Sequence, residues 1–166
     1  MNGQGLVVGV DFSGPMLRLG ARKAALRAEG RRIAFVEGDG LRLPFPDGCF
    51  DLAAVAFGLR NIVDCRAAIR EMARVTRPRG KVAVLEFSFP PRGPIRYVYL
   101  AYFLFVLPWI GNLVSRSHAY CYLSRSVRAW PEPDELTAMM REAGLSEVHC
   151  RPLTFGIACL HIGVHP

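Results

Sequence analysis

The sequence predicts an α/β fold with a mostly parallel sheet, because short apolar runs alternate with helical patterns along the chain. The runs are continuously apolar and rich in β-branched residues, which is typical of strands buried on both faces of a parallel sheet. The chain has 166 residues, 51% hydrophobic and 21% charged, so we expect one globular domain. This composition excludes a disordered or low-complexity protein.

The first predicted strand comprises residues 6–10 and ends at Asp11. Ser13 is a suitable N-cap and Pro15 suits a first helical turn, so a helix is predicted to follow directly. Small apolar residues then recur at helical spacing until Gly30, where we expect the helix to end. Asp11 is therefore predicted to lie at the carboxyl end of a strand.

The pattern repeats with predicted strands at 33–36 and 50–56. A helix is predicted from Asp64, and Pro78-Arg79-Gly80 is expected to end it before a strand over 81–87. The side chains on its inward stripe are Cys65, Ala68, Ile69, Met72 and Ala73. Strands and helices therefore alternate through the first half of the chain.

The run from Tyr97 to Val114 carries no charged residue and reaches the lower limit of about 17 residues for a membrane-spanning helix. Pro108 and Gly111 interrupt it and arginines flank both of its ends, so we expect it not to span. Beyond it, Tyr120 and Tyr122 belong to a polar-edged aromatic cluster. That cluster is either core packing or a substrate wall.

The last part of the chain predicts a helix opened by Pro133 and Asp134 and closed by Gly144. Its apolar positions are Leu136, Met139, Met140 and Ala143. Residues 146–151 and 156–164 then predict an antiparallel pair of strands, which an otherwise parallel sheet accepts at its edge.

The net charge and the cysteine content exclude fewer classes of function than the strand pattern does. The net charge is +7, carried almost entirely by scattered arginines, so nucleic acid, anionic lipid and phosphorylated substrates all remain open on charge alone. No basic recognition helix or aromatic stacking strand appears, which disfavours nucleic acid. The five cysteines have no metal-ligand spacing, so we expect no metal site. The N-terminus lacks a secretory signal, which favours a cytoplasmic location.

Two acidic residues follow predicted strands, at the sheet edge where α/β proteins bind ligands. Asp11 ends the first strand, and Asp39 lies in a Gly-Asp-Gly turn after the second. A carboxylate accepts hydrogen bonds from a ribose diol, and Asp39 could also reach an adenine edge. The alternative is that Asp11 only precedes a helix and Asp39 only makes a turn.

The segment Phe57-Gly58-Leu59-Arg60-Asn61 follows the third strand and so belongs to the same edge. The Arg60 guanidinium can stabilise an oxyanion and Asn61 can donate and accept hydrogen bonds, which makes both candidate catalytic residues. Glu86, at the end of the next strand, either orients Arg60, binds a substrate hydroxyl or caps a turn. Arg60 as an ordinary surface residue remains the alternative.

The chain resembles the C-methyltransferases of ubiquinone and menaquinone biosynthesis, which are class I S-adenosylmethionine-dependent enzymes. The motifs that carry the resemblance are Gly9–Ser13 with Met16-Leu17, Gly38-Asp39, Leu43–Asp47, Phe57–Asn61, Arg74–Gly80 and Leu85–Ser88. The resemblance implies a Rossmann-like class I methyltransferase sheet with an antiparallel C-terminal strand. It also implies a single domain over 1–166, in which 92–130 form a helical insertion that covers the substrate.

The resemblance assigns roles to individual residues. It implies that Asp11 binds the ribose of S-adenosylmethionine, that Asp39 and Gly40 lie against its adenine, and that Ala56 and Phe57 line its methionine side. Three positions depart from the family pattern. Ala56 stands where a serine is usual, Arg79 replaces the first glycine of a Pro-Gly-Gly turn, and Arg125 stands where an acid is common.

The largest departure is at the N-terminus. The family carries a strand and a glycine-rich Gly-Thr-Gly loop ahead of the strand that ends at Asp11, whereas only Met1 to Gly5 precede that strand here. The fold is therefore expected to be N-terminally truncated. Because the family's first strand is central in the sheet, we expect two strand edges without partners.

The implied function is S-adenosylmethionine-dependent C-methylation of a polyprenylated quinol, demethylmenaquinol or a related ring. Benzoquinone and naphthoquinone rings remain alternatives, and no residue stands out as the base. The apolar run 97–114, with substrate contacts from Tyr120, Tyr122 and Glu86, would receive the isoprenoid tail at the inner face of the membrane. The competing hypothesis is an inactive, truncated methyltransferase-like fragment or partner-binding remnant. The protein could also form a homodimer.

Overall fold

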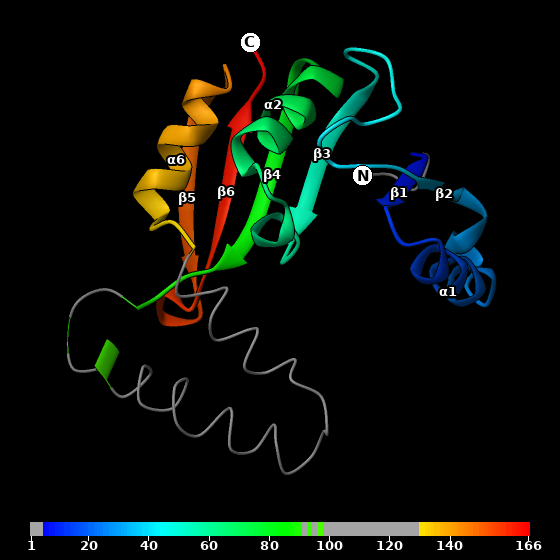
Figure 1. Ribbon diagram of the computed structural model, residues 1–166, viewed down its shortest axis with the longest axis horizontal. Helices are drawn as coiled ribbons and strands as arrows, with labels where there is room; N and C mark the ends of the chain where they lie inside the picture. The colour runs from blue at the N-terminus through cyan, green and yellow to red at the C-terminus, as the bar shows by residue number, and fades with distance from the viewer. Residues whose placement is uncertain (1–4, 91–92, 94–95, 98–129) are drawn as a thin grey trace. The chain divides into compact units, whose positions relative to one another are not determined.

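The computed structural model describes residues 5–90, 93, 96–97 and 130–166 (Figure 1). The chain divides into two compact units, Met1–Pro46 and Asp47–Pro166. Strands and helices alternate in both units, and parallel strand pairs occur in both. The predicted α/β class is therefore confirmed.

The first unit is a parallel strand pair with one helix between the strands. It contains β1 (Val7–Asp11), α1 (Gly14–Ala25) and β2 (Ile33–Glu37), and the register places Asp11 beside Glu37. The prediction that the helix continues to Gly30 is wrong. The chain turns back over the helix end, where a Cβ at Gly30 would lie 1.8 Å from the Ala24 carbonyl oxygen. A short 3-10 helix, Ala28–Arg32, then leads into β2.

The half-buried Phe35 of β2 lies close to both α1 and β1. A Cβ at Gly20 of α1 would lie 2.8 Å from the Phe35 ring, and one at Gly9 of β1 would lie 3.3 Å from it. A side chain at Gly20 would force the Phe35 ring to shift, and one at Gly9 would crowd it. Ala24 of α1 is buried against the same layer.

The second unit contains a four-stranded sheet in the order β3-β4-β6-β5. The strands are β3 (Phe50–Ala56), β4 (Thr76–Phe87), β5 (Ser146–Leu153) and β6 (Ala158–Val164). β3 and β4 are parallel, whereas β6 is antiparallel to both β4 and β5. The predicted antiparallel C-terminal pair is confirmed.

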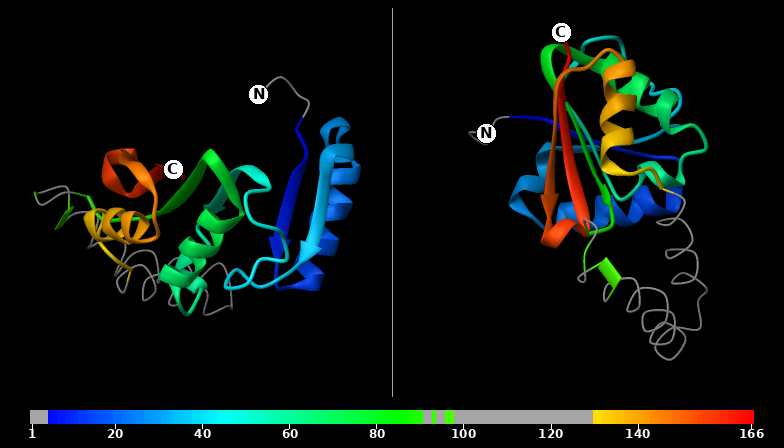
Figure 2. Two further views of the ribbon diagram at one scale, coloured as in Figure 1. Left: turned by 90° about the horizontal axis from the view of Figure 1, so that it is seen from above. Right: turned by 90° about the vertical axis from the view of Figure 1, so that its left-hand side faces the viewer.

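Helices α2 (Cys65–Val75) and α6 (Pro133–Glu142) lie on the same face of this sheet (Figures 1 and 2). The Asp64 carboxylate caps α2 by accepting a hydrogen bond of 2.9 Å from the Ala67 N–H. The core is formed by the apolar side chains Ala68, Ile69, Met72, Ala73 and Val75 of α2, Leu136, Met139 and Met140 of α6, and Val82 and Val84 of β4. The predicted stripe of α2 is correct except for Cys65, which is half-buried.

The junction between α2 and β4 differs from its prediction. The strand begins at Thr76, immediately after the helix, and the Thr76 hydroxyl donates a hydrogen bond of 2.7 Å to the Met72 carbonyl. Residues 77–80 loop out, because Phe50 pairs with Thr76 whereas Leu52 pairs with Lys81. The Pro-Arg-Gly segment therefore makes a bulge within β4 instead of separating it from the helix.

Four strands have a free edge among the residues that the structure describes, β1 and β2 in the first unit and β3 and β5 in the second. β1 pairs only with β2, and β3 pairs only with β4. The two edges without partners that the sequence predicts are among these four.

Most of the predicted insertion 92–130 lies outside the described residues, together with Tyr120, Tyr122 and all of the apolar run 97–114 except Tyr97. Within the described ranges, every helix is too short or too polar to cross a membrane.

Candidate active site

In the first unit, Asp11 presents its carboxylate at the carboxyl end of β1. Oδ1 accepts a hydrogen bond of 2.8 Å from the Ser13 N–H, which fixes the orientation of the half-buried side chain. The Gly38 N–H donates to the Asp11 carbonyl at 3.1 Å and ties the end of β1 to the turn after β2. No described residue bonds to Oδ2 of Asp11, so this oxygen can accept hydrogen bonds from a ligand.

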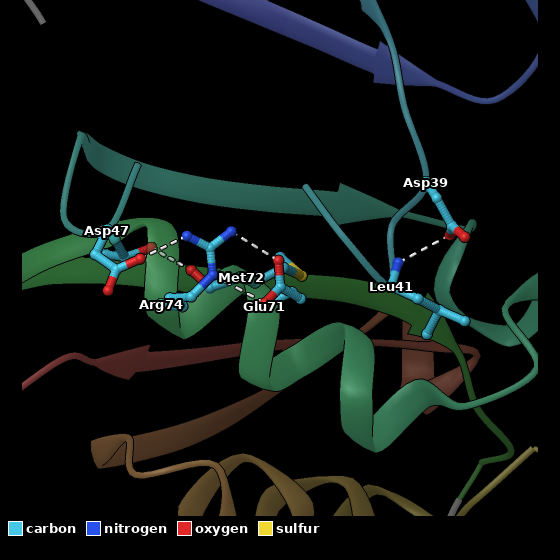
Figure 3. A network of polar contacts seen from close by, with 7 residues as sticks. Asp39, Leu41, Asp47, Glu71, Met72 and Arg74 are labelled. Atoms are coloured by element: carbon cyan, nitrogen blue, oxygen red, sulfur yellow. Dashed lines mark hydrogen bonds and ion pairs between the residues drawn. The ribbon is translucent and has the colours of Figure 1, made fainter. Parts of the chain in front are cut away.

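Asp39 and Gly40 form the turn that follows β2. Oδ1 of Asp39 accepts from the Leu41 N–H at 2.9 Å, while the side chain remains exposed (Figure 3). The preceding Gly38 leaves little room, since a Cβ there would lie 3.0 Å from Cδ of Pro44. The structure thus places Asp11, Asp39 and Gly40 at one edge of a single parallel strand pair. Two carboxylates at this edge fit the hydroxyl and amino donors of an adenosine group.

In the second unit, Arg60 and Glu86 form a buried ion pair. Nη1 of Arg60 lies 2.8 Å from Oε2 of Glu86, and the side chains are 9% and 1% exposed. The Arg60 backbone N–H donates to Oε1 at 3.3 Å, and the Phe87 N–H donates to Oε2 at 3.2 Å. Of the roles left open for Glu86, its contacts favour the orientation of Arg60.

The remaining contacts of Arg60 hold its guanidinium in one place. Nη1 also donates to the Phe57 carbonyl at 2.7 Å, and Cζ lies 5.1 Å from the centre of the Phe87 ring. The Phe57 and Phe87 rings pack with their centres 4.5 Å apart. Nε is buried and has no hydrogen-bond partner among the described residues. Arg60 is therefore not an ordinary surface residue, and its Nε–H donor has no acceptor among the described residues.

Phe57 has a strained backbone at the end of β3. Its φ is +54°, a left-handed conformation that costs a non-glycine residue about 1 kcal/mol. The strain aims the Phe57 carbonyl at Arg60, while its N–H donates to the Leu85 carbonyl of β4 at 2.8 Å. Such strain is frequent at functional sites.

Asn61 and Ala56 lie near this pair in the chain. Asn61 ends a short 3-10 helix, Leu59–Asn61, and is exposed, as is Ala56 at the end of β3. The structure therefore brings Ala56, Phe57, Arg60 and Asn61 to the β3 end beside Glu86 of β4. Tyr120 and Tyr122, the other predicted substrate contacts, fall outside the described part of the chain.

Two features of this unit were missed in the sequence. Phe87 supplies the ring under Arg60, and the only signal was its place next to Glu86. Arg74 of α2 binds Glu71 at 2.8 Å and Asp47 at 2.6 Å (Figure 3), and these carboxylates, Glu71 first, raise the pKa of its guanidinium. This network holds the loop before β3 against α2.

Parallel strands with helices between them, and carboxylates at or after their carboxyl ends, are typical of a Rossmann-like nucleotide-binding fold. An S-adenosylmethionine-dependent methyltransferase from Aquifex aeolicus shares the fold with a TM-score of 0.68 at 13% identity, covering 98% of this chain and 70% of that one. The ubiE/COQ5 methyltransferase family matches residues 1–165, and the chain belongs to this family.

Relatives of this family are similar over nearly the whole chain. The demethylmenaquinone methyltransferase of Thermus thermophilus is 49% identical over 96% of this chain and 72% of its own length. That of Geobacillus kaustophilus is 42% identical over 96% of this chain and 68% of its own length. The predictions of a methyltransferase and of S-adenosylmethionine as its cofactor are confirmed, and the hypothesis of a non-enzymatic remnant is not favoured.

Proposed function

We propose that the protein methylates a ring carbon of demethylmenaquinol. The naphthoquinone ring is favoured over a benzoquinone because the relatives at 49% and 42% identity are named demethylmenaquinone methyltransferases. The observation that carries the chemistry is the Nε of Arg60, a buried donor without a partner among the described residues, in the 3-10 helix that follows β3.

The residues proposed to hold the cofactor lie at three strand ends. Asp11 would accept from the ribose hydroxyls through Oδ2, and Asp39 with Gly40 would lie against the adenine. Ala56 and Phe57 would line the methionine side. S-adenosylmethionine supplies an electrophilic methyl group when it is bound.

Arg60 would act on the substrate through charge. A ring carbon of a quinol becomes a stronger nucleophile when the neighbouring hydroxyl loses its proton, and the resulting oxyanion needs a donor. A guanidinium cannot be the base, but Nε–H can donate to the oxyanion. The Asn61 amide would bind the same oxygen or the neighbouring hydroxyl, so both residues position the reacting carbon.

The polyprenyl tail is proposed to leave the site through the apolar run 97–114, with Tyr120 and Tyr122 as part of the substrate wall. Its apolar composition and flanking arginines support peripheral association with the cytoplasmic face of a membrane. If so, a salt or carbonate wash without detergent releases the protein from vesicles, whereas retention after the wash would favour a spanning segment.

Methyl transfer tests the proposed function directly. We expect transfer from methyl-labelled S-adenosylmethionine to reduced demethylmenaquinone but not to the oxidised form, because only the quinol yields the oxyanion. Removing one such donor lowers kcat by about 100-fold or more in comparable sites, so we expect that loss for Arg60→Gln.

Arg70→Gln is the matched control, since Arg70 is exposed on α2 and takes no part in the site. Equal transfer to the oxidised ring, or an Arg60→Gln enzyme as active as this control, would contradict the proposal.

A further inference from the structure

We propose that Glu86 is a positioning residue, which fixes the Arg60 guanidinium and sets the charge that the substrate oxygen meets. This inference rests on the proposed function. It assigns Glu86 an effect on the reaction although its carboxylate does not touch the substrate.

The geometry leaves Arg60 one orientation. The Glu86 carboxylate receives both the backbone N–H of Arg60, at 3.3 Å, and its Nη1, at 2.8 Å. The Phe57 carbonyl receives Nη1 from another direction, and the Phe87 ring lies under the guanidinium. Nη1 is therefore occupied, which leaves the N–H donors on Nε and Nη2 to meet a substrate oxygen.

Because the Arg60–Glu86 pair is buried, its net charge affects how easily the substrate hydroxyl ionises. The side chains of Glu86 and Arg60 are 1% and 9% exposed, so water screens neither charge well. Before the substrate ionises the pair is neutral, and an oxyanion adds a negative charge to it. Without the Glu86 charge, the guanidinium would stabilise the oxyanion more strongly, and the substrate hydroxyl would lose its proton at lower pH.

Within the described residues, the other contacts of the Arg60–Glu86 pair are with uncharged groups of Phe57 and Phe87. The residue in register with Glu86 on β6 is Cys159, which carries a buried thiol. Within the described residues, no other charged side chain forms an ion pair with Arg60 or Glu86. A shift in the pH at which kcat reaches half its maximum in Glu86→Gln therefore reports the effect of the Glu86 charge on the substrate hydroxyl.

The experiment measures kcat against pH for Glu86→Gln, which keeps the size of the side chain and removes its charge. We expect kcat at its plateau to fall about tenfold, because Arg60 loses its fixed orientation. The acid limb of the pH profile, where kcat falls as the pH is lowered, should shift to lower pH. KM for S-adenosylmethionine should stay unchanged. A residue that only stabilises the fold would lower the amount of active enzyme without moving the acid limb.

Two further variants sharpen the result. The double variant Arg60→Gln with Glu86→Gln should be no less active than Arg60→Gln alone, because Glu86 acts through Arg60. Ser88→Ala is the control, as Ser88 is buried directly after β4, and its acid limb should stay in place. If Glu86→Gln does not fold, Glu86→Asp keeps the charge and loses reach. Glu86→Asp should then lower kcat and leave the acid limb of the pH profile unmoved.

The outcomes separate this inference from the proposed function. If the wild-type enzyme fails to methylate the quinol, the proposed function falls and this inference with it. If the wild-type enzyme is active and Glu86→Gln has the same kcat and acid limb, only the positioning role of Glu86 is overturned. Additive losses in the double variant would also overturn it.

Discussion

Arg79 adopts a backbone conformation that favours glycine, at a position where the resemblance expects glycine. Its φ is +62°, and its N–H donates to the His165 carbonyl at 2.8 Å in the bulge of β4. A left-handed conformation costs a residue with a Cβ about 1–2 kcal/mol, whereas glycine adopts it freely. The side chain is exposed, so its loss removes little packing.

Arg79→Gly should therefore raise the free energy of unfolding by about 0.5–1 kcal/mol, after the greater freedom of glycine in the unfolded chain is subtracted. Urea unfolding measures this difference. Arg79→Ala removes the same side chain but keeps the strain, so it should give no gain. A gain as large with alanine as with glycine would show that the arginine side chain, and not the backbone, is the cause.

At the scale of single residues, the sequence predicts which side chains reach a strand end but not what they contact there. Asp11, Asp39 and Arg60 were found because each follows an apolar run. The burial of the Arg60–Glu86 pair depends on the β3–β4 register and on the left-handed Phe57, and no local pattern reports either. The sequence therefore left three alternative roles open for Glu86.

At the scale of elements, His161 links β6 to α6. Its Nε2 lies 3.0 Å from the Pro133 carbonyl in the first turn of α6, while Nδ1 is buried without a partner among the described residues. Burial lowers the pKa of the imidazole below its usual value of 6.5, an effect only partly offset by the Pro133 carbonyl and the charge of Asp134. Burial thus favours the neutral ring.

The sign of the resulting pH dependence follows from proton uptake. Below about pH 6.5 the unfolded chain binds a proton at this histidine that the folded chain resists, so the free energy of unfolding falls as the pH falls. Above that pH both states hold the neutral ring, and the contribution is constant.

His161→Gln should flatten this dependence between pH 7.5 and 5.5, as measured by urea unfolding. The exposed His149 of β5 supplies the control variant, His149→Gln. A wild-type slope that survives in His161→Gln would place the titrating group elsewhere.

Element types were predictable because each strand and helix has its own periodicity, whereas their ends depended on tertiary contacts. α1 stops at Ala25 because the chain folds back at Gly30 onto Ala24. β4 starts at Thr76 because Phe50 pairs with it across a bulge. Neither contact is visible in a local window of sequence.

At the scale of the whole molecule, the candidate site residues divide between the two units. Asp11, Asp39 and Gly40 belong to Met1–Pro46, while Ala56, Phe57, Arg60, Asn61 and Glu86 belong to Asp47–Pro166. The resemblance assigns the ribose and adenine contacts to the first set and the methionine and substrate contacts to the second. Substitutions in the two sets therefore test separate assignments.

The most direct test is calorimetric titration of the 166-residue chain with S-adenosylhomocysteine, after a cooperative thermal transition shows that it is folded. We expect saturable binding with one site per chain. Asp11→Asn should weaken it by about 10- to 100-fold, the size expected for hydrogen bonds to a charged group. A folded chain that gives no binding heat at several temperatures, or that binds equally well with Asp11→Asn, would contradict the assignment of this site.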